Sequence, residues 1–433
     1  LRRISNGMKL QIAIIALAII AAVAAVLVFS GALPGLPGRG PRVSLVMWGT
    51  FPEELLREPL YKIKQAHDEI DISYIEKHAG AFESEFLNAL AKGEGPDIVI
   101  IPPELAFKQR DKFFNLAGSS LSERTFRDTF IDGADILLAG GEIRAVPFLI
   151  DPLMLYWNRD LLRNESLSEP PKTWDEFLTH AAKLTKIDQA GNILASGAAL
   201  GLETNVQNFK EILSMLILQA GNPIVEPANF RVVISRESPF SKTPAENALR
   251  FYTEFARPSR SSYSWSGAEP DSREAFSRGI LAFYFGFASE FPRLRSQNPH
   301  LNFDLTAPPQ IRGGKLNLTY GRIYSLGVPQ NSKYPAAAIQ TIFYLLENDA
   351  LGSFAEKLAL APSKRALLSA LPKNPVTESV WREAVRVKSW PEIDPAKTSE
   401  IFGSMIRSVY SGAKNAANAV RDAELQLQEI YPN

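Results

Sequence analysis

Short apolar runs alternate with longer segments of helical periodicity in the first part of the chain, and this alternation limits it to few folds. Residues 43–48, 71–75 and 97–101 have the length and composition of strands. Between them, residues 53–69 and 82–92 repeat apolar side chains three and four positions apart, as one face of a helix does. Strands that alternate with helices in this way form βαβ units around a buried sheet. The sequence therefore predicts an α/β fold.

Two later regions carry clear helix signals. Thr173 can cap a helix start, and Glu176, three positions later, can reach back to the backbone, which is the capping-box pattern. Near the C-terminus, residues 401–410 and 416–430 each carry one apolar stripe, and Gly412 separates them. We expect two packed helices to close the chain.

The N-terminal segment is strongly apolar. Apart from Gln11, residues 10–29 are apolar, and at about 1.5 Å per residue they match a hydrocarbon core of about 30 Å. Positive residues precede this segment, which favours a cytoplasmic N-terminus. The expected division is a cytoplasmic N-terminus at 1–9, a transmembrane helix or uncleaved signal anchor at 10–30, and a linker at 31–42. A cleavable signal peptide is the alternative, because residues 30–32 resemble a cleavage site. Both interpretations export the rest of the chain.

Composition and missing motifs exclude several classes of function. The chain has 433 residues and 45% hydrophobic content, enough for a large core, and no cysteine for thiolate chemistry. Lys and Arg total 47, as do Asp and Glu, so no basic surface for nucleic acid is expected. The 4 histidines are scattered, and neither a phosphate-binding loop nor a hydrolase elbow is present. We expect no catalytic residue, no metal site and no cofactor.

The aromatic content of 10% includes many rings beside glycine, proline or strand ends. Sugars present apolar C–H faces and polar rims, so flat rings with a few carboxylates and amides suit their capture. Core packing is the ordinary alternative for each ring. Paired carboxylates such as Glu53 and Glu54 would serve glycoside hydrolysis only about 5–9 Å apart across a cleft, so a solvated helix face is the simpler interpretation.

Several segments together resemble one known family. A strand ending at Trp48 is followed by Ala-Leu-Ala-Lys-Gly-Glu-Gly-Pro-Asp-Ile-Val at 89–99. More specific is Val-Pro-Phe at 146–148, then Asn-Arg-Asp-Leu-Leu at 158–162 and Pro-Pro-Lys-Thr-Trp-Asp-Glu-Phe at 170–177. Further matches lie at 275–283, 320–328 and 361–365. From about residue 43 to 430, the chain resembles the family 1 extracellular solute-binding proteins of ABC importers, the sugar-binding group that includes maltose-binding protein.

The resemblance implies a two-lobed periplasmic-binding-protein-like (type II) fold with a hinge and an interlobe cleft. Each lobe would be built from discontinuous chain. The expected segments are 43–150 with about 270–322 for lobe 1, and 151–269 with about 323–433 for lobe 2. Crossings near 147–151, 265–272 and 320–328 would join the lobes, which would close on a ligand by hinge motion.

The resemblance also implies which residues line the cleft. Trp48 would be a stacking ring, while Glu104 and Asp151 would bind ligand hydroxyls. Aromatic walls are expected after Gly279 and beside the crossings. The expected ligand-binding residues are Trp48, Glu104, Phe148, Asp151, Trp265, Phe285, Phe287 and Tyr324.

The implied function is binding without catalysis. A monomer, held by a single membrane pass with its lobes on the extracytoplasmic side, would capture a sugar or oligosaccharide and present it to ABC permease subunits. No nucleic-acid partner is expected. A membrane-anchored carbohydrate hydrolase and a ligand sensor remain alternatives. An amino acid, peptide or polyamine remains an alternative ligand, because fold does not dictate function.

Overall fold

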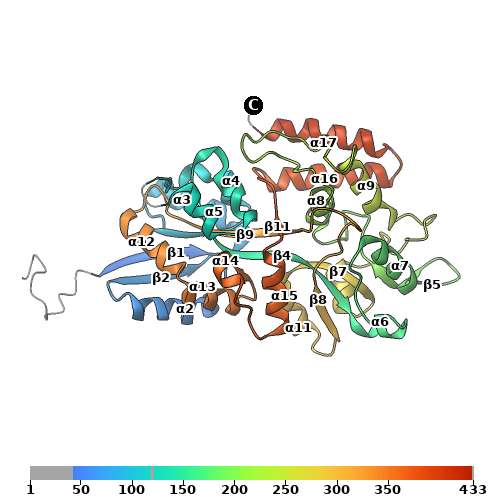
Figure 1. Ribbon diagram of the computed structural model, residues 1–433, viewed down its shortest axis with the longest axis horizontal. Coiled ribbons are helices and arrows are strands. Elements are labelled where there is room, and N and C mark those ends of the chain that lie inside the picture. The colour runs from blue at the N-terminus through green and yellow to red at the C-terminus, as the bar shows by residue number, and fades with distance from the viewer. Residues whose placement is uncertain (1–41, 119–120, 432–433) are drawn as a thin grey trace, which may run out of the picture.

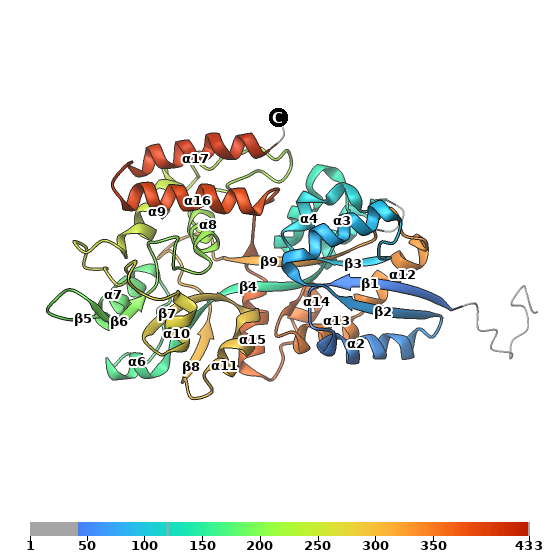
Figure 2. The same ribbon diagram turned by 180° about the vertical axis from the view of Figure 1, so that it is seen from behind.

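The protein consists of two lobes joined by shared strands (Figures 1 and 2). The computed structural model describes residues 42–118 and 121–431. The first lobe contains β1 (Val43–Gly49), α2 (Glu53–Ala66), β2 (Ile70–Glu76), α3 (Phe82–Lys92), β3 (Ile98–Ile101), α4 (Leu105–Lys108), α5 (Glu123–Thr129), α12 (Pro335–Leu345), α13 (Asn348–Lys357), β10 (Ala361–Pro362) and α14 (Arg365–Leu368).

The second lobe is formed mainly by the middle and the end of the chain. It contains α6 (Arg159–Asn164), α7 (Trp174–Leu184), β5 (Lys186–Ile187), β6 (Ile193–Ala198), α8 (Phe209–Gln219), α9 (Pro244–Glu254), α10 (Ser272–Ser277), β7 (Leu281–Phe287), α11 (Phe291–Gln297), β8 (Phe303–Thr306), α16 (Pro395–Tyr410) and α17 (Ala416–Ile430). Between the lobes lie β4 (Val146–Asn158), β9 (Thr319–Gly327), β11 (Val387–Lys388) and α15 (Pro375–Ala384). The α/β class predicted from the sequence is confirmed.

The sheet of the first lobe is mixed. β1 lies between β2 and β3 and is parallel to both, as the alternating pattern predicts. β3 then pairs with β9, and β9 with the first half of β4, both in the antiparallel sense. The two antiparallel neighbours come from distant parts of the chain, so the local alternation in the sequence could not reveal them.

The sheet of the second lobe begins on the same strand. Residues 153–157 of β4 pair antiparallel with β7, and residues 155–158 with β8. β6 joins β7 in the parallel sense. Because β4 is buried along almost its whole length, it carries a nearly continuous apolar run from one sheet into the other.

The strand pairings divide the chain differently from the expected segments. β7 and β8, within 270–322, belong to the sheet of the second lobe, whereas α12 and α13, within 323–433, lie in the first lobe with α13 against α2. The order of segments in the sequence does not show which lobe each one joins, because this depends on strand pairing between distant parts of the chain.

The crossings also differ in part. β4 and β9 pass between the lobes near two of the expected positions. Residues 265–272 do not, because Trp265 is fully buried in the second lobe and donates from its indole nitrogen to Asn205. The third connection is instead β11, which pairs with the start of β9, and the segment 389–394 that leads into α16.

The helix signals correspond to observed caps. Thr173 Oγ1 accepts from the backbone nitrogen of Glu176 and begins α7, whereas the Glu176 carboxylate accepts from the backbone nitrogen of Lys172 at 2.8 Å. The reach-back half of the pattern therefore ends one residue earlier than expected. α16 and α17 pack against each other, and Gly412, with φ of 77°, lies between them, so the expected C-terminal helix pair is confirmed.

The expected cytoplasmic N-terminus at 1–9, the membrane span at 10–30 and the linker at 31–42 lie outside the described residues, apart from Arg42. Among the residues that are described, none of the helices has the length and apolar character needed to span a membrane.

Candidate functional site

A cavity of about 120 Å³ lies between the two lobes. The first lobe contributes the loop after β3, helix α4 and residues 136–137. The second lobe contributes the first turn of α8 and part of the segment 389–395. Strand β9 passes between these two sides and also lines the cavity. The lining residues are Pro103, Glu104, Ala106, Phe107, Ile136, Leu137, Lys210, Glu211, Tyr320, Gly321, Arg322, Ile323, Ser389, Trp390, Glu392 and Pro395. Polar side chains from both lobes therefore meet in one cavity, which is partly open to solvent.

Glu104 is the acidic group on the side of the first lobe. Pro102 and Pro103 follow β3, and because proline has no backbone N–H, the strand ends there. Glu104 is exposed and lies just before α4, whose Phe107 is buried. No side chain or backbone group in the described part of the chain pairs with its carboxylate, which leaves both oxygens free to accept hydrogen bonds.

Lys210 and Glu211 form the opposite wall, at the first turn of α8. Lys210 Nζ donates to Glu392 Oε1 at 2.5 Å and lies 3.9 Å from Glu211 Oε1. Thr398 also donates its hydroxyl to Glu392. Burial raises the pKa of Glu392, and Lys210 partly offsets this effect. Because the carboxylates of Glu211 and Glu392 surround the single ammonium of Lys210, this wall of the cavity offers mainly hydrogen-bond acceptors.

Arg322 extends from β9 between the two walls. Its guanidinium carbon lies 3.8 Å from the centre of the Phe287 ring, and its Nη2 lies 3.9 Å from Glu211 Oε1. The side chain is still 31% exposed. A planar donor that rests on an aromatic face in this way is held in orientation while several N–H groups stay available.

Asp151 supports this arrangement from beneath the cavity. It is fully buried on β4, opposite Arg322 in the strand pairing, and accepts from Ser289 N at 3.0 Å and Ser289 Oγ at 2.7 Å. Burial raises the pKa of Asp151 to about 6, although the hydrogen bonds from Ser289 and the charge of Arg322 act in the opposite direction. Asp151 therefore joins the crossing strand to the segment that follows β7.

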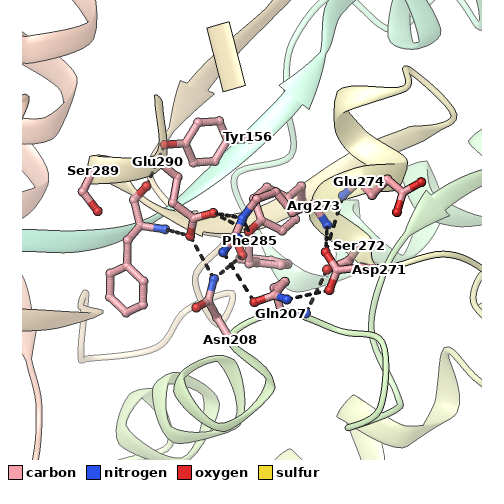
Figure 3. Close-up of polar contacts among 12 residues, drawn as sticks. Tyr156, Gln207, Asn208, Asp271, Ser272, Arg273, Glu274, Phe285, Ser289 and Glu290 are labelled. Atoms are coloured by element: carbon pink, nitrogen blue, oxygen red, sulfur yellow. Dashed lines mark hydrogen bonds and ion pairs between the residues drawn. The ribbon is translucent and has the colours of Figure 1, made fainter. Parts of the chain in front are cut away.

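A polar network fixes the start of α8 against the end of β7 (Figure 3). Glu290 accepts from Tyr284 Oη at 2.7 Å, from Arg273 Nε at 2.5 Å and from the backbone nitrogen of Phe287 at 3.0 Å. Asn208, which directly precedes α8, donates to Glu290 Oε1 at 3.2 Å. The network thereby positions the helix turn that carries Lys210 and Glu211.

Chemically, the cavity can both accept and donate hydrogen bonds on two sides of a small ligand. Trp390 adds an aromatic group, and its indole nitrogen is already bound to Ser214 at 3.2 Å. Within residues 42–118 and 121–431, no group of three or more His, Asp and Glu side chains is placed to hold a metal ion.

Four of the expected site residues lie at or near this cavity. Glu104 lines it directly. Phe287 lies beneath the Arg322 guanidinium, and Asp151 lies opposite Arg322 in the strand pairing. Tyr324 packs against Phe51 at 4.7 Å between ring centres, and burial together with the charge of Asp151 raises its pKa.

The other four expected residues are buried in the cores of the lobes and do not line the cavity. Trp48 lies at the end of β1 with Lys77 Nζ 3.9 Å from its ring centre. Phe148 packs edge-on against Phe354 in the first lobe. Trp265 and Phe285 lie in the second lobe, where Phe285 packs on Trp174 and Phe177. In this structure the rings of these four residues contact other side chains of the lobes and not the cavity.

Five polar or aromatic residues of the cavity were not predicted from the sequence: Lys210, Glu211, Arg322, Trp390 and Glu392. A signal existed for the first two, because they precede a run in which residues 212–219 of α8 are all buried. Charged residues that open such a helix must lie at its accessible end or be paired. For Arg322 no local signal existed, since a single arginine in a strand is ordinary.

Two α/β lobes, joined by crossing strands and enclosing a polar cavity, define a two-lobed ligand-binding protein. The chain belongs to the bacterial extracellular solute-binding proteins, whose family model matches residues 52–351. The resemblance drawn from the sequence is therefore confirmed.

Individual relatives agree with this assignment. A probable ABC transporter-binding protein of Deinococcus radiodurans is 24% identical over 304 residues, covering 67% of this chain and 70% of the relative. Among solved structures, the cyclic alpha-maltosyl-1,6-maltose binding protein from Arthrobacter globiformis superposes with a TM-score of 0.74 at 16% identity, covering 90% of this chain and 99% of that one. A cyclo/maltodextrin-binding protein complexed with maltotetraose has a TM-score of 0.72 at 17% identity, covering 90% and 97%. These likenesses establish the two-lobed fold.

Proposed function

We propose that the protein captures a carbohydrate in the interlobe cavity and presents it to an ABC permease on the extracytoplasmic side of the membrane. The observation that carries the proposal is the convergence of Glu104, Glu211 and Arg322, from two lobes and a crossing strand, on one cavity. Carboxylates that accept and a guanidinium that donates match the dense hydroxyl groups of a sugar. The sugar ligands named for the similar solved structures support the same class.

The size of the cavity supports a hinged mechanism. At about 120 Å³ it is smaller than the roughly 300 Å³ at which ligand pockets begin. A sugar would therefore enter with the lobes further apart, and its contacts with both lobes would favour the closed form. β4, β9 and the segment 389–394 connect the lobes and would bend as hinges.

Within this proposal, the residues divide by role. Glu104 and Glu211 accept hydrogen bonds from ligand hydroxyls, and Arg322 donates to them. Asp151 and Phe287 hold Arg322 in place without touching the ligand. The chain acts as a binding protein and catalyses no reaction on the sugar.

Isothermal titration calorimetry with a panel of maltose, mannose and cyclic oligosaccharides, with amino acids and polyamines for comparison, tests the ligand class. We expect one sugar to bind one per chain. Glu211→Gln should weaken it by about 1–3 kcal/mol, since a hydrogen bond to a charged group has this value when lost. Glu94→Gln is the matched control, because Glu94 is exposed and far from the cavity.

Two results would contradict the proposal. Saturable binding of an amino acid or polyamine with no response to any sugar would overturn the ligand class. Release of reducing sugar from the same panel, abolished by Glu104→Gln or Glu211→Gln, would show a hydrolase. Reconstitution with a permease from the same genome, in which the liganded protein stimulates ATP hydrolysis, tests delivery.

A further inference from the structure

A second pocket, unrelated to the interlobe cavity, lies within the second lobe. It has a volume of about 360 Å³ and is formed by the end of α8, by α9, by Trp174 and by the loops at 240–241 and 311–315. The first turn of α8 lines the interlobe cavity, whereas its last turn lines this pocket. With a rise of about 1.5 Å per residue, the residues of α8 that line the two sites lie roughly 8–15 Å apart along the helix.

The floor of the pocket offers no free hydrogen-bonding group. Trp174 Nε1 donates to Gln219 Oε1 at 2.7 Å, and Gln219 Nε2 donates to the carbonyl oxygens of Pro309 and Leu318 at 3.1 and 3.0 Å. Leu216, Ala248 and Phe251 supply apolar walls around this satisfied centre. The polar side chains of Ser241 and Asn247 also line the pocket, but they are engaged, because Asn247 Nδ2 donates to Ser241 Oγ at 3.3 Å and Asn247 Oδ1 accepts from Arg250 at 3.0 Å. Few groups could replace the hydrogen bonds that a buried sugar makes to water, so the pocket favours a largely apolar ligand.

Phe240 forms an exposed wall that is held in place. Its side chain is 48% exposed although it is a large hydrophobic residue. The ring packs on Gly221, where an added Cβ would lie 2.8 Å from a ring carbon, and Ser238 Oγ accepts from the backbone nitrogen of Phe240. Ile311, 40% exposed, is a second large hydrophobic residue that lines the pocket. Exposed apolar side chains that gather around a pocket are typical of a binding surface.

Lys315 gives the pocket a charge. Its Nζ lies 5.9 Å from the centre of the Phe240 ring, and in the described part of the chain no carboxylate pairs with it. The nearby arginine of the same loop, Arg312, is occupied by Asp175 at 2.9 Å. An unpaired ammonium beside an apolar cavity favours a ligand with an anionic end.

We propose that this pocket is a second ligand site, which takes a small aromatic or aliphatic molecule carrying a carboxylate. The apolar part would lie on Phe240 and above Trp174, and the carboxylate would pair with Lys315. Binding here is independent of the sugar proposed for the interlobe cavity, because the two sites share no lining residue.

Titration calorimetry of the full chain with naphthalene-1-acetate and with its neutral amide, naphthalene-1-acetamide, tests the proposal. We expect the carboxylate to bind one per chain with a Kd below about 1 mM, and about two- to fivefold more tightly than the amide. Lys315→Gln should remove this difference, and Phe240→Ala should weaken both probes. Lys333→Gln, a lysine of the first lobe, is the matched control.

Each alternative result has a definite meaning. No saturation by the carboxylate, or equal affinity in Phe240→Ala and the parent chain, would overturn the site. Equal binding of acid and amide to the parent chain would overturn the anionic class. Loss of naphthalene-1-acetate binding in Glu211→Gln would place the probe in the interlobe cavity and overturn the proposal, while leaving the proposed sugar function to its own experiment.

Discussion

Asp151 and Arg322 lie directly opposite each other on β4 and β9, where β4 leaves one sheet and enters the other. Asp151 is buried and bound to Ser289, whereas Arg322 reaches the cavity on top of Phe287. Asp151 thus stabilises the strand that crosses between the lobes, whereas Arg322 lines the candidate site.

Replacing Asp151 should therefore affect stability first. In Asp151→Ala, both oxygens that accept from Ser289 are lost, and the buried space that the carboxylate filled is left empty. We expect the free energy of unfolding to fall by about 1–3 kcal/mol in urea denaturation. The exposed Asp128→Asn should change it by less than about 0.5 kcal/mol. Unchanged stability in Asp151→Ala would show that the two Ser289 bonds do not hold the crossing.

Glu383 predicts a pH dependence of stability. It is buried on α15, its Oε1 has no partner, and burial raises its pKa from 4.5 to about 7. The folded state therefore binds this proton more tightly than the unfolded state. The stabilisation is complete below pH 4.5 and is lost as the pH rises through about 7, on the order of 3 kcal/mol in all.

The measurement is urea denaturation between pH 4 and pH 8 of the parent chain and Glu383→Gln. We expect stability to decline by about 3 kcal/mol less in the variant than in the parent chain across this range, because the variant cannot ionise at this position. Asp151, with a pKa raised to about 6, contributes a decline of comparable size and the same sign, and this decline persists in the variant. Burial also raises the pKa of Glu392, which acts in the same direction. Identical slopes in both proteins would contradict the assignment.

Because the Arg322 guanidinium rests on the Phe287 ring, we expect arginine and lysine to differ in ligand affinity at this position. Arg322→Lys keeps the charge but loses the planar group that rests on Phe287 and several of its donors. We expect ligand affinity in calorimetry to fall by at least about 1 kcal/mol, with little change in stability. Arg312→Lys, at an exposed position, should leave affinity unchanged. Full affinity in Arg322→Lys would mean that charge alone is needed there.

A contact between the lobes predicts an effect on closure. Phe230, from the second lobe, lies 6.4 Å from Phe107 and 5.8 Å from the Arg110 guanidinium, both of the first lobe. Its φ of 58° is unfavourable for a residue with a side chain. We expect Phe230→Gly to remove both the contact and the strain, and to increase the radius of gyration of the unliganded protein in X-ray scattering.

Ligand affinity should fall in the same variant by about threefold, or roughly 0.7 kcal/mol, because the closed form becomes less populated. Phe240→Ala is the control, since that exposed ring lies within one lobe. An unchanged radius of gyration would show that Phe230 does not hold the lobes together.

The sequence predicted local elements well and the assembly of the lobes poorly. Apolar runs and caps such as Thr173 act within a few residues, so β1, α3 and the C-terminal helices follow from neighbours in the chain. The pairing of β4 with β7 joins residues more than a hundred positions apart, and no local pattern carries it.

For the site, the difficulty was to tell rings in the core from rings in a cleft. Trp265 and Phe285 stand beside turns and strand ends, as binding rings do, yet both are buried. Glu104 was expected from the family resemblance, and it does line the cavity, just after the buried strand β3 and two prolines. Arg322 could be assigned to the site only from the structure, in which β9 passes between the lobes.

The position of Arg322 on a crossing strand has a geometric consequence for capture. When two bodies rotate about an axis, points near that axis move least, and displacement grows with the length of the lever arm. Glu104 and Glu211 lie on opposite sides of the cavity. In the proposed hinge motion they would separate as the lobes open, whereas Arg322, on a strand that joins the lobes, would stay on the Phe287 ring. On the proposed function, an incoming sugar would therefore contact the nearly stationary Arg322 first, and the two carboxylates would reach it as the lobes close.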